Sequence, residues 1–410
     1  MPRKPKAKLK SKDVQGLKYL NVLQPLLESL HDIGTQRDTA GNRQLHMDHY
    51  CMLILLWMFS PTIDSLRGLQ QASQLKKLQS KFKIPRAALG TLSEAPAVFD
   101  PEPLKHIAEE LGHQIPKISA ANSNSPLSQI DKTLTAVDGS VVKLLTQVAE
   151  LAWVKVGDHP ATCGYRLHTQ FEILHGLPNR IDATSANPKG ENDERAVLAK
   201  SLEADRLYVI DRGYIKADLF NAIVDIKSSY VCRMRDSVKY DTLEARELSD
   251  EAIEQGVLSD EIVELQSSKH TTKLNHKVRL VCIRCTPHTS RGRRSARQLN
   301  SSAPSSDGVL RVLTDELDLP AELISQIYAH RWTIELFFRM IKQMLGCRHL
   351  LSTKPNGVAI QIYSAIIACM LIMLYTGHAP KKRTFEMVCF YISGWASLEE
   401  LESHIKNLKP

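Results

Sequence analysis

Residues 328–342 read Tyr-Ala-His-Arg-Trp-Thr-Ile-Glu-Leu-Phe-Phe-Arg-Met-Ile-Lys. Tyr328, Arg331, Glu335 and Lys342 lie at offsets of 0, 3, 7 and 14 in this segment. At about 100° per residue, all four fall within about 60° on a helix and share one face. The apolar residues take a separate, wider sector, which predicts a helix with one face in a core. From geometry alone, a solvated polar stripe with ordinary ion pairs explains the other face equally well.

Two short apolar segments earlier in the chain each end in an aspartate. Thr133-Leu-Thr-Ala-Val-Asp138 and Leu207-Tyr-Val-Ile-Asp211 are predicted to be strands. The elements predicted around them are strands at 165–174, 180–184 and 229–235 and helices at 191–202 and 215–226. This order indicates an α/β sheet with carboxylates where strands end, which is where ligands collect in such sheets.

The flanking regions differ in character. The first ~120 residues read as helices, at 14–30, 47–59, 66–82 and 101–111. Strand candidates at 262–265, 277–285 and 309–313 lie between polar loops, and long helices are predicted at 321–345, 357–375 and 397–407. The expected organisation is a basic tail (1–13), a helical region (14–125), a core in two parts (126–235 and 319–378), a β-rich basic insertion (236–318) and a C-terminal helical tail (379–410).

The motifs together resemble those of a known family. Tyr-x2-Arg-x3-Glu-x6-Lys, complete here from Tyr328 to Lys342, is similar to the signature helix of the "YREK" DDE transposases of insertion-sequence family four. Thr135-Ala-Val-Asp138-Gly-Ser resembles the first-aspartate strand of that family, and Val209-Ile-Asp211-Arg-Gly-Tyr resembles the second. The resemblance spans residues 133–346, and the Ser65-Leu-Arg-Gly-Leu segment also looks like the N-terminal region of this family.

The resemblance implies a ribonuclease-H-like α/β core with a mainly β insertion, flanked by helical N- and C-terminal regions. It implies cut-and-paste DNA transposition, in which water first cleaves the transposon end and the freed 3′-hydroxyl then attacks target DNA. Asp138, Asp211 and Glu335 would be catalytic and would hold two Mg²⁺ ions, with Mn²⁺ as a substitute. Two cations about 3.5–4 Å apart can serve the attacking and leaving oxygens of an in-line displacement, and Mg²⁺ prefers oxygen ligands.

The same resemblance assigns DNA contacts. Tyr328, Arg331 and Lys342 would hold DNA phosphates beside the carboxylates, and we assign Arg212 of the second motif the same role. Arg can grip a phosphate with a bidentate fork, whereas Lys acts as a point charge. The expected partner is double-stranded DNA, both transposon ends and target. The expected assembly is a homodimer on two ends, with the N-terminal helices reading the end sequence.

Charge clustering agrees with a DNA partner. The net charge is only +8, but no acidic residue lies between Glu264 and Asp307. The basic residues of that region are Lys269, Lys273, Lys277, Arg279, Arg284, Arg291, Arg293, Arg294 and Arg297. Neutralising phosphates releases counterions and drives non-specific affinity, although mobile solvated loops would show the same composition.

Other features narrow the class of protein. Eight scattered cysteines and the absence of a secretory leader indicate reduced thiols in the cytoplasm. The apolar run at 356–376 is expected to be a buried helix and not a membrane span. His46 and His49 lie three residues apart, with Asp48 between them, which resembles half a metal site. No further ligand is evident in the sequence, so we interpret these residues as helix-surface residues. Cys282 and Cys285 lack a second pair and do not indicate a zinc site.

Two alternatives share parts of this pattern. A stand-alone metal-dependent nuclease would use the same carboxylates without strand transfer. A non-catalytic DNA-binding protein derived from a transposase would be expected to have lost part of the triad, whereas all three acids are present.

Overall fold

The computed structural model describes residues 24–34, 38–60, 62–115, 126–143, 153–154, 162–185, 190–236, 238–266, 272–285, 308–346, 351–352, 354–378 and 381–408. The strands are β1 (Thr133–Lys143), β2 (Trp153–Val154), β3 (Thr162–Glu172), β4 (Leu177–Ser185), β5 (Arg206–Ile210), β6 (Ser229–Arg233), β7 (Tyr240–Ala245), β8 (Val257–Leu265), β9 (Val278–Arg284) and β10 (Val309–Thr314). The helices are α2 (Gln24–Glu28), α3 (Met47–Phe59), α4 (Leu66–Ser73), α5 (Lys76–Phe82), α6 (Leu89–Val98), α7 (Pro103–Gln114), α8 (Glu194–Lys200), α9 (Ala217–Asp225), α10 (Asp250–Glu254), α11 (Ala321–Ala329), α12 (Trp332–Gly346), α13 (Pro355–Thr376), α14 (Lys382–Ile392) and α15 (Leu398–Lys406).

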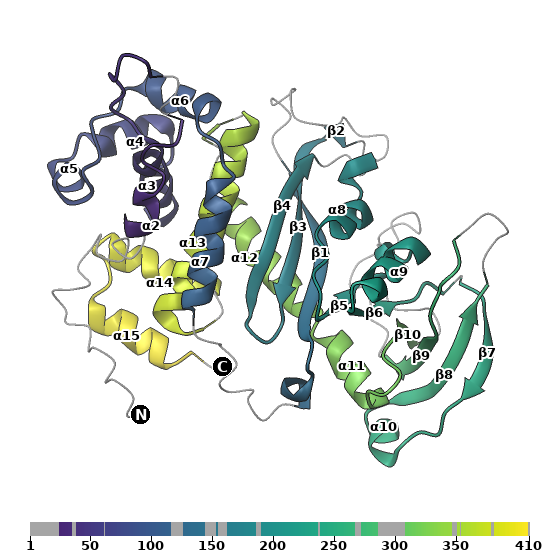
Figure 1. Ribbon diagram of the computed structural model, residues 1–410. Coiled ribbons are helices and arrows are strands. Elements are labelled where there is room, and N and C mark those ends of the chain that lie inside the picture. Colours follow the sequence, from purple (N-terminus) through teal and green to yellow (C-terminus); the bar gives the residue numbers. More distant parts are fainter. Residues whose placement is uncertain are drawn as a thin grey trace, which may run out of the picture.

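The centre of the molecule is a mixed sheet, seen in the middle of Figure 1. β1, β3 and β4 form an antiparallel meander, and β5 and β6 run parallel to β1 on its other side. Parallel neighbours need a crossover, which α8 and α9 provide. The resulting order β4-β3-β1-β5-β6 is that of a ribonuclease-H-like core, so the predicted α/β fold is confirmed.

The β-rich stretch after β6 continues this same sheet. β10 pairs with β6, and β9, β8 and β7 follow in antiparallel order. Three of these strands match the predicted segments, whereas β7 was not predicted. Its side chains are mostly exposed and polar, so they lack the alternation that indicates a half-buried strand. The stretch therefore extends the core sheet, as the right side of Figure 1 shows.

A buried ion pair fixes this extension to the segment that precedes α11. Arg279 on β9 is 2% exposed and donates from Nε and Nη2 to the two carboxylate oxygens of Asp260 on β8, both at 2.8 Å. Its Nη1 also donates to the carbonyls of Glu316, Leu317 and Leu319, just before α11. One side chain thus connects β8, β9 and the start of α11.

Helices from both ends of the chain pack together beside the sheet, at the left of Figure 1. α13 contacts α3, α6 and α7 from the N-terminal region as well as α12, and α14 contacts α3. α13 is long and apolar enough to cross a membrane, but 89% of its apolar window is buried inside the protein. The prediction of a buried core helix at 356–376 is therefore confirmed.

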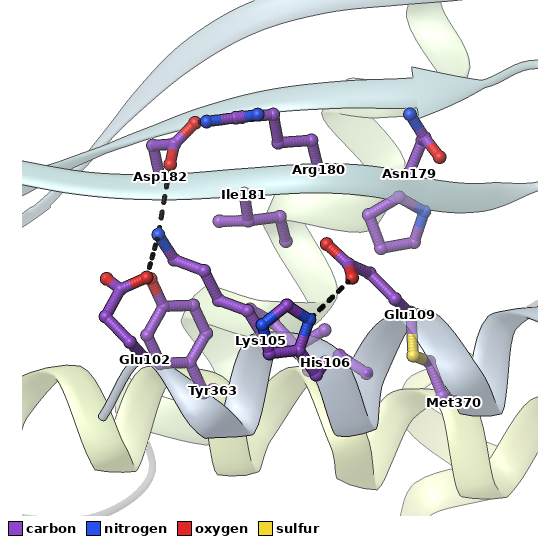
Figure 2. Close-up of a pocket in the computed structure, with 13 residues that line it drawn as sticks. Glu102, Lys105, His106, Glu109, Asn179, Arg180, Ile181, Asp182, Tyr363 and Met370 are labelled. Atoms are coloured by element: carbon purple, nitrogen blue, oxygen red, sulfur yellow. Dashed lines mark hydrogen bonds and ion pairs between the residues drawn. The ribbon is translucent and has the colours of Figure 1, made fainter. Parts of the chain in front are cut away.

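Figure 2 shows where the N-terminal helices meet the sheet. Lys105 on α7 lies 3.2 Å from Asp182 on β4 and 2.8 Å from Glu102. Its charged end also lies 5.9 Å from the ring centroid of Tyr363 on α13. Lys105 thus links α7 to both the sheet and α13.

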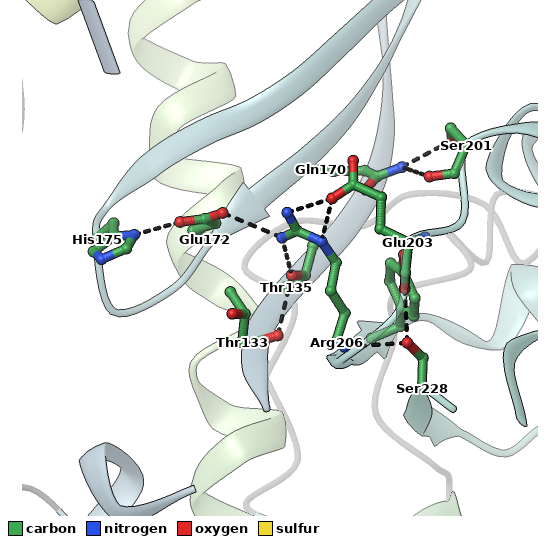
Figure 3. Close-up of polar contacts among 10 residues, drawn as sticks. Thr133, Thr135, Gln170, Glu172, His175, Ser201, Glu203, Arg206 and Ser228 are labelled. Atoms are coloured by element: carbon green, nitrogen blue, oxygen red, sulfur yellow. Dashed lines mark hydrogen bonds and ion pairs between the residues drawn. The ribbon is translucent and has the colours of Figure 1, made fainter. Parts of the chain in front are cut away.

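At the edge of the sheet where β5 begins, Arg206 joins three elements (Figure 3). Its guanidinium donates to Thr135 on β1 at 3.0 Å and to Glu172 on β3 at 3.2 Å. Its Nε donates to Glu203 at 2.7 Å, and the side chain is only 11% exposed. Arg206 therefore holds β1, β3 and β5 in register at the end opposite Asp211.

We expect Arg206→Met to lower the free energy of unfolding by about 2 kcal/mol, because hydrogen bonds to charged groups contribute about 1.5–3 kcal/mol. Urea unfolding followed by circular dichroism measures the change. Lys200→Met is the control, because among the described residues Lys200 pairs with the exposed Glu191 alone, so its loss should change stability by less than about 1 kcal/mol. Equal stability of the Arg206 variant and wild type would contradict this assignment.

Several predicted elements need correction. The single helix predicted at 321–345 is two helices, α11 and α12, separated at His330 and Arg331. Backbone bonds of i to i+3 type occur there, and the Thr333 hydroxyl donates to the His330 carbonyl at 2.8 Å, which tightens the chain locally. Likewise the helix predicted at 66–82 is two helices, α4 and α5, and α6 and α14 were not predicted. The tail at 1–13 lies outside the described residues.

Candidate active site

The register of two parallel strands brings Asp138 and Asp211 together. β1 pairs with β5 from Thr133 with Arg206 to Val137 with Ile210. The next residue in each segment is an aspartate, Asp138 after Val137 and Asp211 after Ile210. The prediction that Asp138 ends its strand is wrong, because β1 continues to Lys143 along β3 after the pairing with β5 stops. Asp211 does follow its strand directly, as predicted.

Glu335 is linked to Asp138 through Arg331. Glu335 lies in the first turn of α12, a helix that packs against β1. Arg331 Nη2 donates to Glu335 Oε1 at 2.7 Å, and Nη1 lies 3.6 Å from Asp138 Oδ2. One guanidinium thus lies between carboxylates that are 197 residues apart in sequence. At least one pair among the three carboxylates is farther apart than 4.8 Å.

Asp138 and Asp211 line a cavity of about 620 Å³. The Gly139 amide donates to the Asp138 carboxylate at 2.8 Å, and the Arg212 amide donates to that of Asp211 at 2.6 Å. The Tyr214 hydroxyl is buried in the cavity wall with no hydrogen-bond partner among the described residues. The site therefore combines two neighbouring carboxylates, whose oxygens can bind a metal ion, with a tyrosine hydroxyl that has no described hydrogen-bond partner.

Burial raises the pKa of Asp138 to about 6. Arg331 and the Gly139 amide oppose this shift, whereas the nearby Asp211 and Glu335 charges add to it. A buried carboxylate beside two others is costly to ionise without a compensating cation. This hard-oxygen donor set fits a divalent cation such as Mg²⁺.

The raised pKa of Asp138 predicts a pH dependence of stability in the presence of a chelator. The folded chain binds this proton more tightly than the unfolded chain, whose carboxyl has an ordinary pKa of 3.8. Stability from this group is therefore gained as the pH falls through 6 toward 4 and is absent above that window. Relative to Asp138→Asn, wild type should gain about 2 kcal/mol between pH 7.5 and pH 4.5. Urea unfolding at both values measures this, and parallel pH profiles for the two proteins would contradict it.

The other predicted site residues lie at different distances from the carboxylates. Arg212 lines the cavity. Tyr328 is 8% exposed, and its ring centroid lies 5.9 Å from the Arg331 guanidinium carbon, so it lies beside Arg331 in the protein interior. Lys342 is exposed about two turns beyond Glu335 on α12, and the contacts that join Asp138, Arg331 and Glu335 do not include it.

The cavity is also lined by four charged residues that the sequence did not predict: Arg166, Glu194, Arg235 and Asp236. Glu194 in the first turn of α8 pairs with Arg166 on β3, and Arg235 donates from Nε to the Arg212 carbonyl at 3.1 Å. Glu194 is so close to Gly139 that a Cβ there would collide with its carboxylate. The Asp-Gly pair of the first motif is the signal for this close approach, but only the folded sheet shows which side chain fills the space.

The basic stretch at 269–297 requires one correction. Arg279, one of its nine basic residues, is buried against Asp260 and does not face DNA. Lys273, Lys277 and Arg284 are exposed, consistent with a DNA-facing surface. Lys269, Arg291, Arg293, Arg294 and Arg297 lie outside the described residues.

Comparison with known proteins agrees with this geometry. The family model described as a transposase DDE domain matches residues 129–371, more than half of the chain. The chain is 27% identical over 216 residues to the transposase-named y4zB protein of Sinorhizobium fredii (52% of this chain, 53% of the relative). It is 25% identical over 257 residues to a Geobacillus stearothermophilus protein named as the transposase of element IS5377 (62% and 60%).

The chain therefore spans between half and two thirds of these relatives' length. A solved piggyBac transposase synaptic complex with hairpin DNA aligns with a TM-score of 0.45 and 10% identity, over 97% of this chain and 86% of that one. The family match covers β1, β5 and α12, and thus Asp138, Asp211 and Glu335. The chain belongs to the transposase DDE-domain family, in agreement with its resemblance to insertion-sequence transposases.

Proposed function

We propose that this protein is a DNA transposase that cleaves DNA at transposon ends and joins the freed ends to target DNA. The observation that carries the proposal is the convergence of Asp138, Asp211 and Glu335, from β1, the end of β5 and α12. Asp138 and Asp211 share a cavity, and the Arg331 guanidinium lies between Asp138 and Glu335. Family membership and the transposase names of relatives support the same assignment.

The three carboxylates would hold two Mg²⁺ ions, which Mn²⁺ could replace. Such cations activate the attacking oxygen and stabilise the leaving one in an in-line displacement at phosphorus. Within the chain, the Gly139 and Arg212 amides orient the two aspartates, and Asp138 presents its partly exposed carboxylate to the cavity. The carboxylates lie on strand and helix backbones, which hold catalytic groups more rigidly than loops do.

Cationic side chains around the cavity would hold the DNA phosphates. Arg212 and Arg235 line the cavity, and Lys342 is exposed on α12. Arg331 at present pairs with two carboxylates, and Tyr328 beside it would limit where its guanidinium can move. A guanidinium so held can bind a phosphate oxygen while it still touches Glu335, which would couple DNA binding to the geometry of the site.

Partners and location follow from the same proposal. Double-stranded DNA would be bound as transposon ends and as target, and a homodimer would hold two ends together. The N-terminal helices would read the end sequence. We also infer that the protein acts in the cytoplasm, on the nucleoid.

A target-joining assay distinguishes this function from that of a stand-alone nuclease. Labelled DNA that carries the ends of the protein's own element is incubated with supercoiled plasmid and Mg²⁺. A transposase converts label into plasmid-sized product, whereas a nuclease gives only shorter fragments. Cleavage with no joined product, at any ratio of end to target, would contradict strand transfer. Binding without cleavage would favour a DNA-binding derivative.

A further inference from the structure

A second group of metal-binding side chains lies far from the catalytic carboxylates, in the N-terminal helical region. Asp48 and His49 lie in the first turn of α3, and His31 follows α2 in the turn that leads away from it. Leu27, Leu30 and Met47 next to these residues are buried in the core, so the backbone positions of both segments are fixed by packing. The sequence showed only the residues on α3; the fold adds His31 as the missing third group.

The ligand atoms of these residues converge. His31 Nδ1 lies 2.9 Å and His49 Nε2 lies 3.7 Å from Asp48 Oδ2, and all three ligand atoms lie within 4.8 Å of one another. The first distance is that of a hydrogen bond, but 3.7 Å is too long for one. Ligand atoms about 2.0–2.1 Å from a tetrahedral zinc are separated by about 3.3 Å, which lies between the two distances.

An ion pair between His31 and Asp48 does not explain two further features of this group. Asp48 Oδ1 is buried with no hydrogen-bond partner in the described part of the chain, although burial of an unpaired carboxylate oxygen is costly. A His31–Asp48 pair leaves that oxygen unsatisfied, and His49 Nε2 faces the same carboxylate from 3.7 Å, beyond hydrogen-bond length. A cation between the three side chains would neutralise the carboxylate and give the three ligand atoms one common partner.

Neighbouring groups hold the imidazoles in place. The His31 carbonyl lies 2.9 Å from His46 Nδ1, and the His46 ring stacks on the His31 ring with centroids 3.9 Å apart. The His46 amide lies 3.5 Å from His49 Nδ1, and His49 Nε2 faces Asp48. His46 thus contacts both imidazoles of the group.

We propose that His31, Asp48 and His49 bind one Zn²⁺ ion that joins the turn after α2 to the start of α3. Two imidazoles and one carboxylate are a borderline-soft donor set that suits Zn²⁺, in contrast to the all-oxygen catalytic set that suits Mg²⁺. The group opens on a cavity of about 360 Å³ that Glu28 and Lys83 also line, which leaves room for water as the fourth ligand. The role is structural: the ion would stabilise the helical region to which we assign recognition of DNA ends.

The test uses the full chain without a histidine tag, with Asp138→Asn, Asp211→Asn and Glu335→Gln introduced to remove the catalytic site. Equilibrium dialysis followed by metal analysis should give one Zn²⁺ per chain. Co²⁺ bound at the same site should show visible absorption that Zn²⁺ abolishes. Adding His49→Ala should lower Zn²⁺ affinity by at least about tenfold and remove the rise in melting temperature that Zn²⁺ causes in the parent.

His106→Ala in the same background is the matched control, because His106 is an exposed histidine on α7 that pairs only with Glu109 among the described contacts. It should bind Zn²⁺ like the parent, and circular dichroism checks that each variant folds. Equal Zn²⁺ affinity of the His49 variant and the parent, or no binding by the folded parent at micromolar Zn²⁺, would overturn the proposal. Neither result depends on transposition, so the site is tested separately from the proposed function.

Discussion

Glu335→Gln is expected to lower the rate of DNA-end cleavage by at least about a thousandfold. Glutamine keeps the size of the side chain but removes the charge that would help to hold a divalent cation. Metal-assisted charge stabilisation contributes several kcal/mol, and about 4 kcal/mol corresponds to a thousandfold in rate. The measurement is single-turnover cleavage of end DNA with saturating protein and Mg²⁺.

Glu322→Gln is the matched control, since Glu322 lies in the first turn of α11 and takes no part in the described contacts that join Asp138, Arg331 and Glu335. It should cleave at the wild-type rate. The Glu335 variant should still bind end DNA, as fluorescence anisotropy can show, because its fold and cationic residues are unchanged. Wild-type cleavage by the Glu335 variant would remove this residue from the catalytic set.

Asp260→Asn is expected to lower the free energy of unfolding by about 3–5 kcal/mol, the usual cost of breaking a buried ion pair from one side. Arg279, which is 2% exposed, would keep its carbonyl contacts near α11 but would lose its carboxylate partner. Urea unfolding with a circular dichroism readout measures the loss. Because Arg279 also holds the segment before α11, the variant should lose cleavage activity near its unfolding midpoint.

Two further variants test whether the unpaired charge of Arg279 causes this loss of stability. Asp250→Asn changes an exposed aspartate on α10 and should have little effect. Asp260→Leu combined with Arg279→Leu removes both charges, and it should be more stable than Asp260→Asn because no unpaired charge stays buried. If the double variant is instead less stable than Asp260→Asn, the unpaired charge is not the main cause of the loss of stability.

The sequence predicted the parts of the fold whose pattern is local. The first half of β1 and the whole of β5 are short, mostly apolar segments, and α3 begins and ends where the apolar run does. The buried face predicted for the 328–342 segment is confirmed, since Ile334, Phe337 and Phe338 are at most 5% exposed. Residue spacing and the family motifs together also predicted Asp138, Asp211 and Glu335 as the catalytic residues, and this stays a prediction. The strand register places the two aspartates side by side, and Arg331 links Asp138 to Glu335.

Other features depend on contacts that spacing does not encode. The break between α11 and α12 comes from a side-chain bond of Thr333 and local i to i+3 bonding, and no proline or glycine signals it. Arg279 was counted among DNA-facing charges because its partner, Asp260, lies on a neighbouring strand. His31 could not be joined to Asp48 and His49, because only the packing of α2 on α3 makes them neighbours.

Iron-directed cleavage of the protein backbone tests the placement of the catalytic cations most directly. Fe²⁺ replaces Mg²⁺ at oxygen-rich sites and, with ascorbate and peroxide, cuts the chain close to where it is bound. Fragments that end near residues 138, 211 and 335, and that disappear with excess Mg²⁺ or in Glu335→Gln, are the predicted result. Cuts confined to other parts of the chain, or cuts at these positions that neither Mg²⁺ nor the variant reduces, would contradict a shared cation site.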